Sequence, residues 1–163
     1  MKIGLAIRQV RSAESDLMGE LLRVGERHKT DHDVYHLTKT LAKMSEDHIE
    51  KLARYNERYG VSVDSDAGED GGGSSLLDPL REKGSELLGR RPEPGLLLLR
   101  DLRKLYMLAS ETSINWVILG QGAQAAKDRE LLQATKECHP DTLRTLKWTN
   151  TKIKETSPQV LMS

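Results

Sequence analysis

Residues 3–28 read IGLAIRQVRSAESDLMGELLRVGERH, and their apolar positions recur in alternating steps of four and three. This spacing places one stripe of side chains along one face of an α-helix, as in a helix that packs into the core of a bundle. The stripe consists of Ile3, Ile7, Val10, Glu14, Leu17, Leu21, Val24 and His28. A carboxylate and an imidazole therefore interrupt an otherwise apolar seam.

A second helix is expected from about Asp31 to Tyr59, with a similar stripe that is interrupted by His48. The connection from the first helix is short. Thr30 or Asp31 can cap the new helix, because both side chains accept hydrogen bonds from first-turn amides. Gly60 follows the last periodic residue and can end the helix. The first two helices are therefore expected to form an antiparallel hairpin.

Two more helices are expected in the C-terminal half, over residues 95–126 and 128–156. Their apolar stripes follow the same helical period. Pro140 lies within the last helix and is expected to kink it, because proline removes a backbone hydrogen bond. Pro158 is expected to end the regular structure. These two helices are also close enough in sequence to form a hairpin.

The chain between the two hairpins has a different composition. Residues 61–75 are rich in Gly, Ser and acidic side chains and predict a flexible acidic linker. Residues 76–94 complete the crossover, in which a short helix can form over Leu76–Leu88. A connection of this length can cross the bundle from end to end and make helices two and three parallel. We therefore expect an all-α fold, with residues 1–163 forming a single four-helix-bundle domain.

Composition agrees with this fold and excludes some classes of protein. Aromatic residues make up 4% of the chain and Phe is absent, whereas a β-sandwich needs aromatic and β-branched side chains on its inner faces. The 25 basic and 25 acidic residues cancel, which argues against a dedicated nucleic-acid-binding protein. One Cys excludes an internal disulfide framework and suits a reducing compartment.

The sequence does not predict export or membrane insertion. The apolar run 3–7 is too short for a signal-peptide core, and the apolar stretch 105–126 is interrupted by Glu111 and by several amides. We expect a soluble cytoplasmic protein that binds no membrane.

A basic strip on the fourth helix could bind RNA, but solvated lysines beside one indole are the simpler explanation. The strip contains Arg144, Lys147, Trp148, Thr151, Lys152 and Lys154.

Polar side chains on or beside the seams are the candidates for a functional site. Glu14 and His48 lie at similar distances from the hairpin that joins their helices, so they should face each other. Glu111 and His139 should fall toward the same middle region of the bundle. Burying a lone carboxylate costs several kcal/mol, so Glu14 needs a partner or a bound ion. The four side chains can either hydrogen-bond to one another and fix the helix register or bind a metal.

This pattern resembles the ferritin-like superfamily, whose di-iron members use a Glu from one helix and Glu-x-x-His from the next, twice over. Glu14 with the segment SEDH, residues 45–48, resembles the first half, and Glu111 with KECH, residues 136–139, resembles the second. Ser and Lys stand where each motif has its bridging Glu. The resemblance implies a ferritin-like bundle and iron, manganese or zinc as cofactor, with oxidase or iron-handling activity. A mononuclear site suits the remaining ligands better than a di-iron pair.

A second group of histidines surrounds the first hairpin. His32 and His36 are separated by four residues and share a helix face, which is a geometry that can chelate a metal, and His28 lies close in sequence. The alternatives are a solvated helix start with capping Asp31 and Asp33, or a pH-sensitive contact.

Taken together, these features favour a non-catalytic binding or assembly module with a protein partner or a second copy of itself. In this interpretation no cofactor is needed, nucleic acid is not a partner, and the central polar residues fix the core. The run of small residues over 120–126 is a candidate surface for self-association. The alternative is a metal-binding ferritin-like protein that uses Glu14, His48, Glu111 and His139, which leaves the question of enzymatic activity open.

Overall fold

The structure is a computed structural model that describes residues 2–62 and 93–163. The regular elements are α1 (Ile3–Arg27), α2 (His32–Ala53), α3 (Asn56–Tyr59), α5 (Pro94–Ala125) and α6 (Arg129–Leu161). The predicted all-α bundle of four long helices is confirmed. The predicted short helix Leu76–Leu88 and nearly all of the predicted linker lie outside the described residues.

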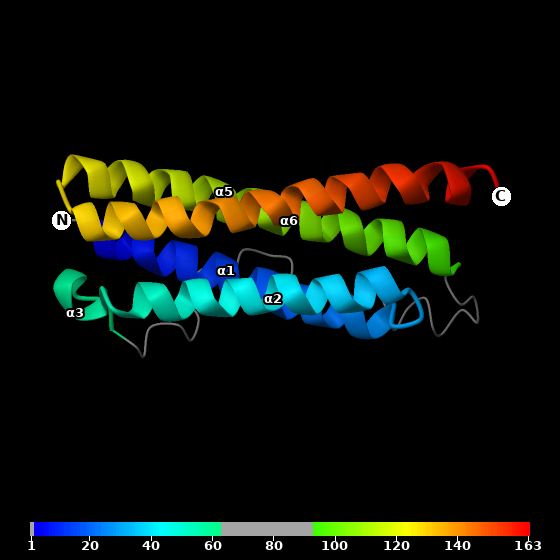
Figure 1. Ribbon diagram of the computed structural model, residues 1–163, viewed down its shortest axis with the longest axis horizontal. Coiled ribbons are helices and arrows are strands. Elements are labelled where there is room, and N and C mark those ends of the chain that lie inside the picture. Colours follow the sequence, from blue (N-terminus) through cyan, green and yellow to red (C-terminus); the bar gives the residue numbers. More distant parts are fainter. Residues whose placement is uncertain (1, 63–92) are drawn as a thin grey trace.

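The four long helices lie side by side and form an elongated bundle (Figure 1). Helix α1 packs against α2 and α5, and α5 packs against α6. Helices α2 and α5 run in the same direction, as predicted for a crossover that spans the length of the bundle (Figure 1). Within the described residues, none of the helices combines the length and the apolar character that a membrane span requires.

The predicted seams of α1 and α5 form the centre of the core. Every seam residue of α1, from Ile3 to His28, is buried. On α5 the buried positions run from Leu98 to Ala123 with the predicted spacing. Burial of these stripes removes apolar surface from water and is the main favourable contribution to the stability of the bundle.

Helix α2 is shorter than predicted. It ends at Ala53, and a turn separates it from the single-turn helix α3. Gly60 then adopts a left-handed conformation with φ of 63°, as expected for a glycine that ends a helix. The next residue, Val61, is 6% exposed and packs into the apolar cluster beside Ile3. The first residue of the predicted flexible linker is therefore part of the core, because burial of the Val61 side chain removes apolar surface from water.

Helix α6 is longer than predicted. It contains both Pro140 and Pro158 and continues to Leu161, so the prediction that Pro158 ends the regular structure is wrong. Proline removes one backbone hydrogen bond, but the last turns of α6 are largely exposed and water can bond to the carbonyl that loses its partner. The hydroxyl of Ser157 also donates to the carbonyl of Ile153 at 2.6 Å.

Candidate functional site

A fully buried carboxylate, Glu14 of α1, lies in the interior of the bundle. Its Oε1 accepts a hydrogen bond from Nε1 of Trp116 on α5 at 2.7 Å and lies 2.8 Å from Nδ1 of His48 on α2. The hydroxyl of Thr142 on α6 donates to the same oxygen at 3.4 Å. Side chains from all four long helices therefore meet at one carboxylate oxygen.

His48 connects this carboxylate to the surface. Its Nε2 lies 3.1 Å from Oδ2 of Asp141 on α6, whose side chain is 30% exposed. Burial alone would lower the pKa of His48, but the hydrogen bonds and charges of Glu14 and then Asp141 outweigh it and raise the pKa above its ordinary value of 6.5. A protonated imidazole donates from both ring nitrogens, so it satisfies both carboxylates at once.

Trp116 completes the packing around this pair. Its side chain is 1% exposed, and its ring meets the ring of His48 edge-on with 5.7 Å between the centroids. The indole N–H would be left without a partner in the core if Glu14 did not accept from it. The carboxylate, the imidazole and the indole thus depend on one another for their hydrogen bonds.

The structure brings together only two of the four predicted metal ligands. Glu14 and His48 are in contact, whereas Glu111 is exposed on α5. Nε2 of His139 lies 2.8 Å from the hydroxyl of Ser113, and burial lowers the pKa of this histidine. Lys136 is also exposed, so its ammonium lies outside the core.

The donors present do not fit the di-iron centre that the resemblance implies. Oε2 of Glu14 is buried and has no hydrogen-bond partner among the described residues, so this oxygen could accept a cation. Both nitrogens of His48 already face carboxylates, so neither presents a free lone pair. In residues 2–62 and 93–163, no three His, Cys, Asp or Glu side chains are placed to hold a metal.

The single cysteine takes the buried position that the sequence suggested for His139. Cys138 is 1% exposed, and burial raises the pKa of its thiol to about 12. The thiolate is the reactive form of cysteine, so this side chain is a poor nucleophile and a poor metal ligand at neutral pH.

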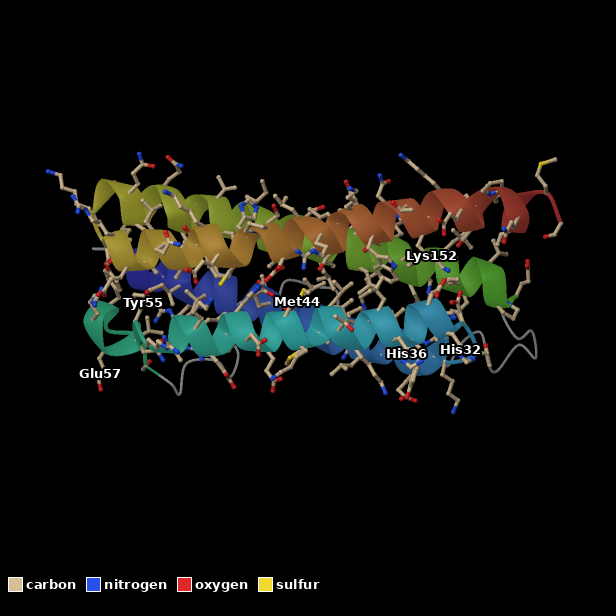
Figure 2. All side chains as sticks on the ribbon, in the orientation of Figure 1. His32, His36, Met44, Tyr55, Glu57 and Lys152 are labelled. Carbon is tan, nitrogen blue, oxygen red and sulfur yellow. The ribbon has the colours of Figure 1, made fainter. Side chains whose placement is uncertain are left out.

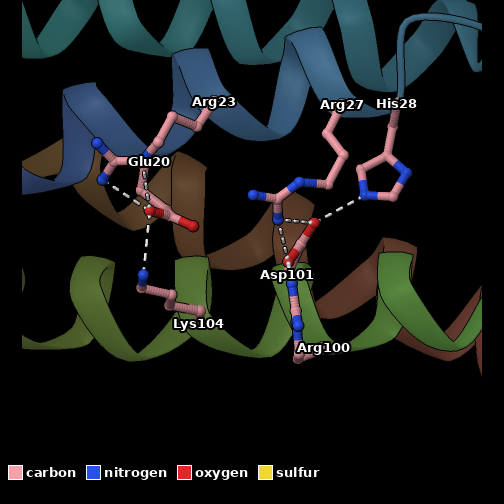
Figure 3. Close-up of polar contacts among 7 residues, drawn as sticks. All are labelled: Glu20, Arg23, Arg27, His28, Arg100, Asp101 and Lys104. Carbon is pink, nitrogen blue, oxygen red and sulfur yellow. Dashed lines mark hydrogen bonds and ion pairs between the residues drawn. The ribbon is translucent and has the colours of Figure 1, made fainter. Parts of the chain in front are cut away.

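A second buried carboxylate, Asp101, lies where α1 packs against α5 (Figure 3). It is 2% exposed, and Nη1 of Arg27 lies 2.9 Å from each of its oxygens. Nε2 of His28 lies 2.8 Å from Oδ2, and Nη2 of Arg100 lies 3.3 Å from Oδ1. Burial would raise the pKa of Asp101, but the bond to His28 and the charges of Arg27 and Arg100 outweigh it and lower the pKa.

Glu20 of α1 forms a similar contact beside the Asp101 cluster, at the same interface between α1 and α5 (Figure 3). It is 2% exposed, its Oε2 accepts a hydrogen bond from Arg23 at 2.8 Å, and Nζ of Lys104 on α5 lies 3.2 Å from the same oxygen in an ion pair. The α1–α5 interface therefore contains buried carboxylates at Glu14, Glu20 and Asp101, each with a cationic or polar partner. Such contacts favour one relative position of the two helices, because a buried charge without its partner is costly.

The predicted histidine group is divided between two places. His28 faces Asp101 of α5, whereas His32 and His36 lie on α2 toward Lys152 of α6 (Figure 2). His32 and His36 lie on the same face of α2, with 6.2 Å between the centroids of their rings. A groove of about 440 Å³ runs here between α2 and α6. Its lining includes His32, His36, Leu37, Trp148, Lys152 and Glu155.

The basic strip on α6 is partly neutralised by neighbouring carboxylates. Nη1 of Arg144 lies 3.4 Å from Asp141, and Nζ of Lys152 lies 3.4 Å from Asp31, the residue that caps α2. Trp148 packs against the apolar core and is only partly exposed. Lys147 and Lys154, the other two basic residues of the strip, are exposed.

Sequence reasoning missed Asp141, Asp101 and Glu20 as partners in the buried contacts. Asp101 could have been found, because it and Glu111 are the acidic residues of α5, and the seam of α1 ends in His28. Asp141 gave no such indication, since it lies beside the predicted stripe of its helix and not on it.

Comparison with protein-family models, with curated proteins and with solved structures finds no match to this chain. The interpretation of its function therefore rests on the geometry of its side chains.

Proposed function

We propose that this chain is a non-catalytic helical module that binds or assembles with another protein through the outer face of α5. The observation that supports this proposal is the exposure of large apolar side chains there. Met107 is 63% exposed, Ile114 59% and Ile118 50%. Leu96 and Val117 on the same helix are 50% and 44% exposed. A helix that is apolar on both its inner and outer sides is normally buried on both, and exposed apolar patches mark interaction sites.

The interior side chains support a structural role for the polar core. His48 uses both nitrogens for Glu14 and Asp141, and His139 bonds to Ser113. The thiol of Cys138 is protonated at neutral pH. Among the buried groups of the described residues, these are the natural candidates for a general base or nucleophile, and each is hydrogen-bonded or protonated.

We propose further that the bundle is of the ferritin-like kind. The parallel course of α2 and α5 and the contact between Glu14 and His48 support this assignment (Figure 1). In this interpretation the protein lacks the metal chemistry of that superfamily, because Glu111 is exposed and His139 is bonded to Ser113. The buried carboxylate and imidazole then hold the helices in register.

The test of the proposed function is site-specific photo-cross-linking in the cells that make the protein. A photo-reactive phenylalanine analogue at Ile114 should give a discrete cross-linked adduct. The same analogue at Glu50, an exposed position on α2, should give none. Equal adducts from both positions, or none from either, would overturn the proposal.

The alternative function, metal binding, has its own test. Protein purified without an affinity tag should contain far less than one iron, manganese or zinc per chain. One tightly held metal ion per chain, lost in Glu14→Ala and in His48→Ala but kept in Glu111→Ala, would favour the alternative and assign it to the central pair.

A further inference from the structure

The exposed apolar side chains of α5 lie along one line. Leu96, Met107, Ile114 and Ile118 are separated by eleven, seven and four residues, which brings them to nearly the same side of a helix with 3.6 residues per turn. The inner seam of α5, which includes Trp116, points the other way into the core. This line of four side chains is here called the outer stripe of α5.

Two opposite charges lie beside the outer stripe, at equal distances from Met107. Arg103 precedes Met107 by four residues and Glu111 follows it by four. Both side chains are exposed, and neither forms a hydrogen bond or an ion pair in the part of the chain that the structure describes. They are therefore available to a partner that places an acidic side chain opposite Arg103 and a basic side chain opposite Glu111.

A second copy of α5 presents this order when it runs antiparallel. In a twofold pairing centred on Met107, Arg103 of each copy faces Glu111 of the other, and Leu96 faces Ile118. Each pair occurs twice, as the symmetry of a dimer with one shared surface requires. Arg100 falls opposite Ile114, and because its guanidinium bonds to Asp101, its methylene stem remains for apolar contact.

We propose that a second copy of this chain covers the outer stripe, with the two α5 helices antiparallel and centred on Met107. The inference rests on the proposed function and names its partner. The small residues of 120–126 are partly turned inward, because Ala123 is fully buried and a Cβ at Gly120 or Gly122 would point toward Thr135 of α6 or Ile3 of α1, respectively.

The test uses charge reversal in the full chain, with sedimentation equilibrium as the measurement. The parent protein should be a dimer. Arg103→Glu and Glu111→Arg should each raise the dissociation constant at least about tenfold, because each homodimer then opposes like charges twice. An equimolar mixture of the two variants should return to dimers, because both cross-pairs are complementary again in the mixed dimer.

Two controls make the result specific. Lys147→Glu, a charge reversal on the exposed side of α6, should leave the dimer unchanged. Circular dichroism should show the same helix content in all variants, because the substituted side chains are exposed.

The outcomes separate this inference from the function on which it rests. A monomeric parent, or a dimer that both single reversals leave intact, overturns the second copy as the partner. In that case a cross-linked adduct from Ile114 with a mass other than twice 18.3 kDa would still support the binding module. An adduct of twice the chain mass together with rescue in the mixture supports both.

Discussion

Glu14→Ala is expected to lower the free energy of unfolding by about 3–5 kcal/mol, the usual cost of removing one partner from a buried charge pair. The substitution leaves the N–H of Trp116 without an acceptor and the imidazole of His48 with Asp141 alone. It also creates a cavity in a region where the side chain is fully buried. Denaturant unfolding followed by circular dichroism measures this loss.

Two companion variants show whether the loss comes from the buried network. Glu50→Ala removes an exposed carboxylate from a helix and should change stability by less than about 0.5 kcal/mol. Glu14→Gln keeps an oxygen for Trp116 but removes the charge opposite His48, so its effect should lie between the two. If Glu14→Ala were as mild as Glu50→Ala, the network would not hold the bundle together.

Asp101→Asn should be the second most damaging substitution, with a loss of about 2–3 kcal/mol, because hydrogen bonds to charged groups contribute this much. The amide keeps the shape of the side chain but not its charge. Arg27 and Arg100 are 29% and 54% exposed and can turn to water, whereas His28 is 9% exposed and cannot. The loss should therefore be smaller than for Glu14→Ala.

The dependence of the free energy of unfolding on pH shows whether the loss of stability in Asp101→Asn comes from the charge of Asp101. Its pKa is lowered in the folded state from 3.8, so its contribution is present above that pH and is lost as the pH falls through the lowered value. Asp101→Asn should make this acid limb less steep, and the part that remains comes from other carboxylates with lowered pKa values, such as Asp128. The pKa of His48 is raised from 6.5, so its contribution is complete below that pH and is lost as the pH rises through the raised value. Asp101→Asn should leave this upper limb unchanged, and loss of both limbs would contradict the assignment.

The fold could be predicted from the sequence because two of the helices carry unambiguous stripes. On α1 every predicted seam residue is buried, and on α5 the buried residues recur with the helical period and include Thr112 and Trp116. The ends of helices were less predictable. Val61 is drawn into the core by neighbours that are distant in sequence, and Pro158 is tolerated because the end of α6 is exposed.

The site could be predicted only in part, because one residue in a helix corresponds to a rotation of about 100°. The sequence pattern predicted that His139 would fall toward the middle of the bundle, but the structure buries Cys138 and turns His139 toward Ser113. Similarly, Glu111 is exposed while its neighbour Thr112 is fully buried. The contact between Glu14 and His48 was predictable because the distance of each from a short hairpin fixes its height.

The placement of the two indoles gives the chain separate optical reporters. Trp116 is buried and its ring meets the ring of His48 edge-on, whereas Trp148 lies on the wall of an open groove. Fluorescence from Trp116 should therefore be emitted at shorter wavelength and follow the proton on His48, while emission from Trp148 should respond to quenchers in the solvent. Replacing Trp148 by phenylalanine would leave the fluorescence of Trp116 as a reporter of the interior, and replacing Trp116 would leave that of Trp148 as a reporter of the surface.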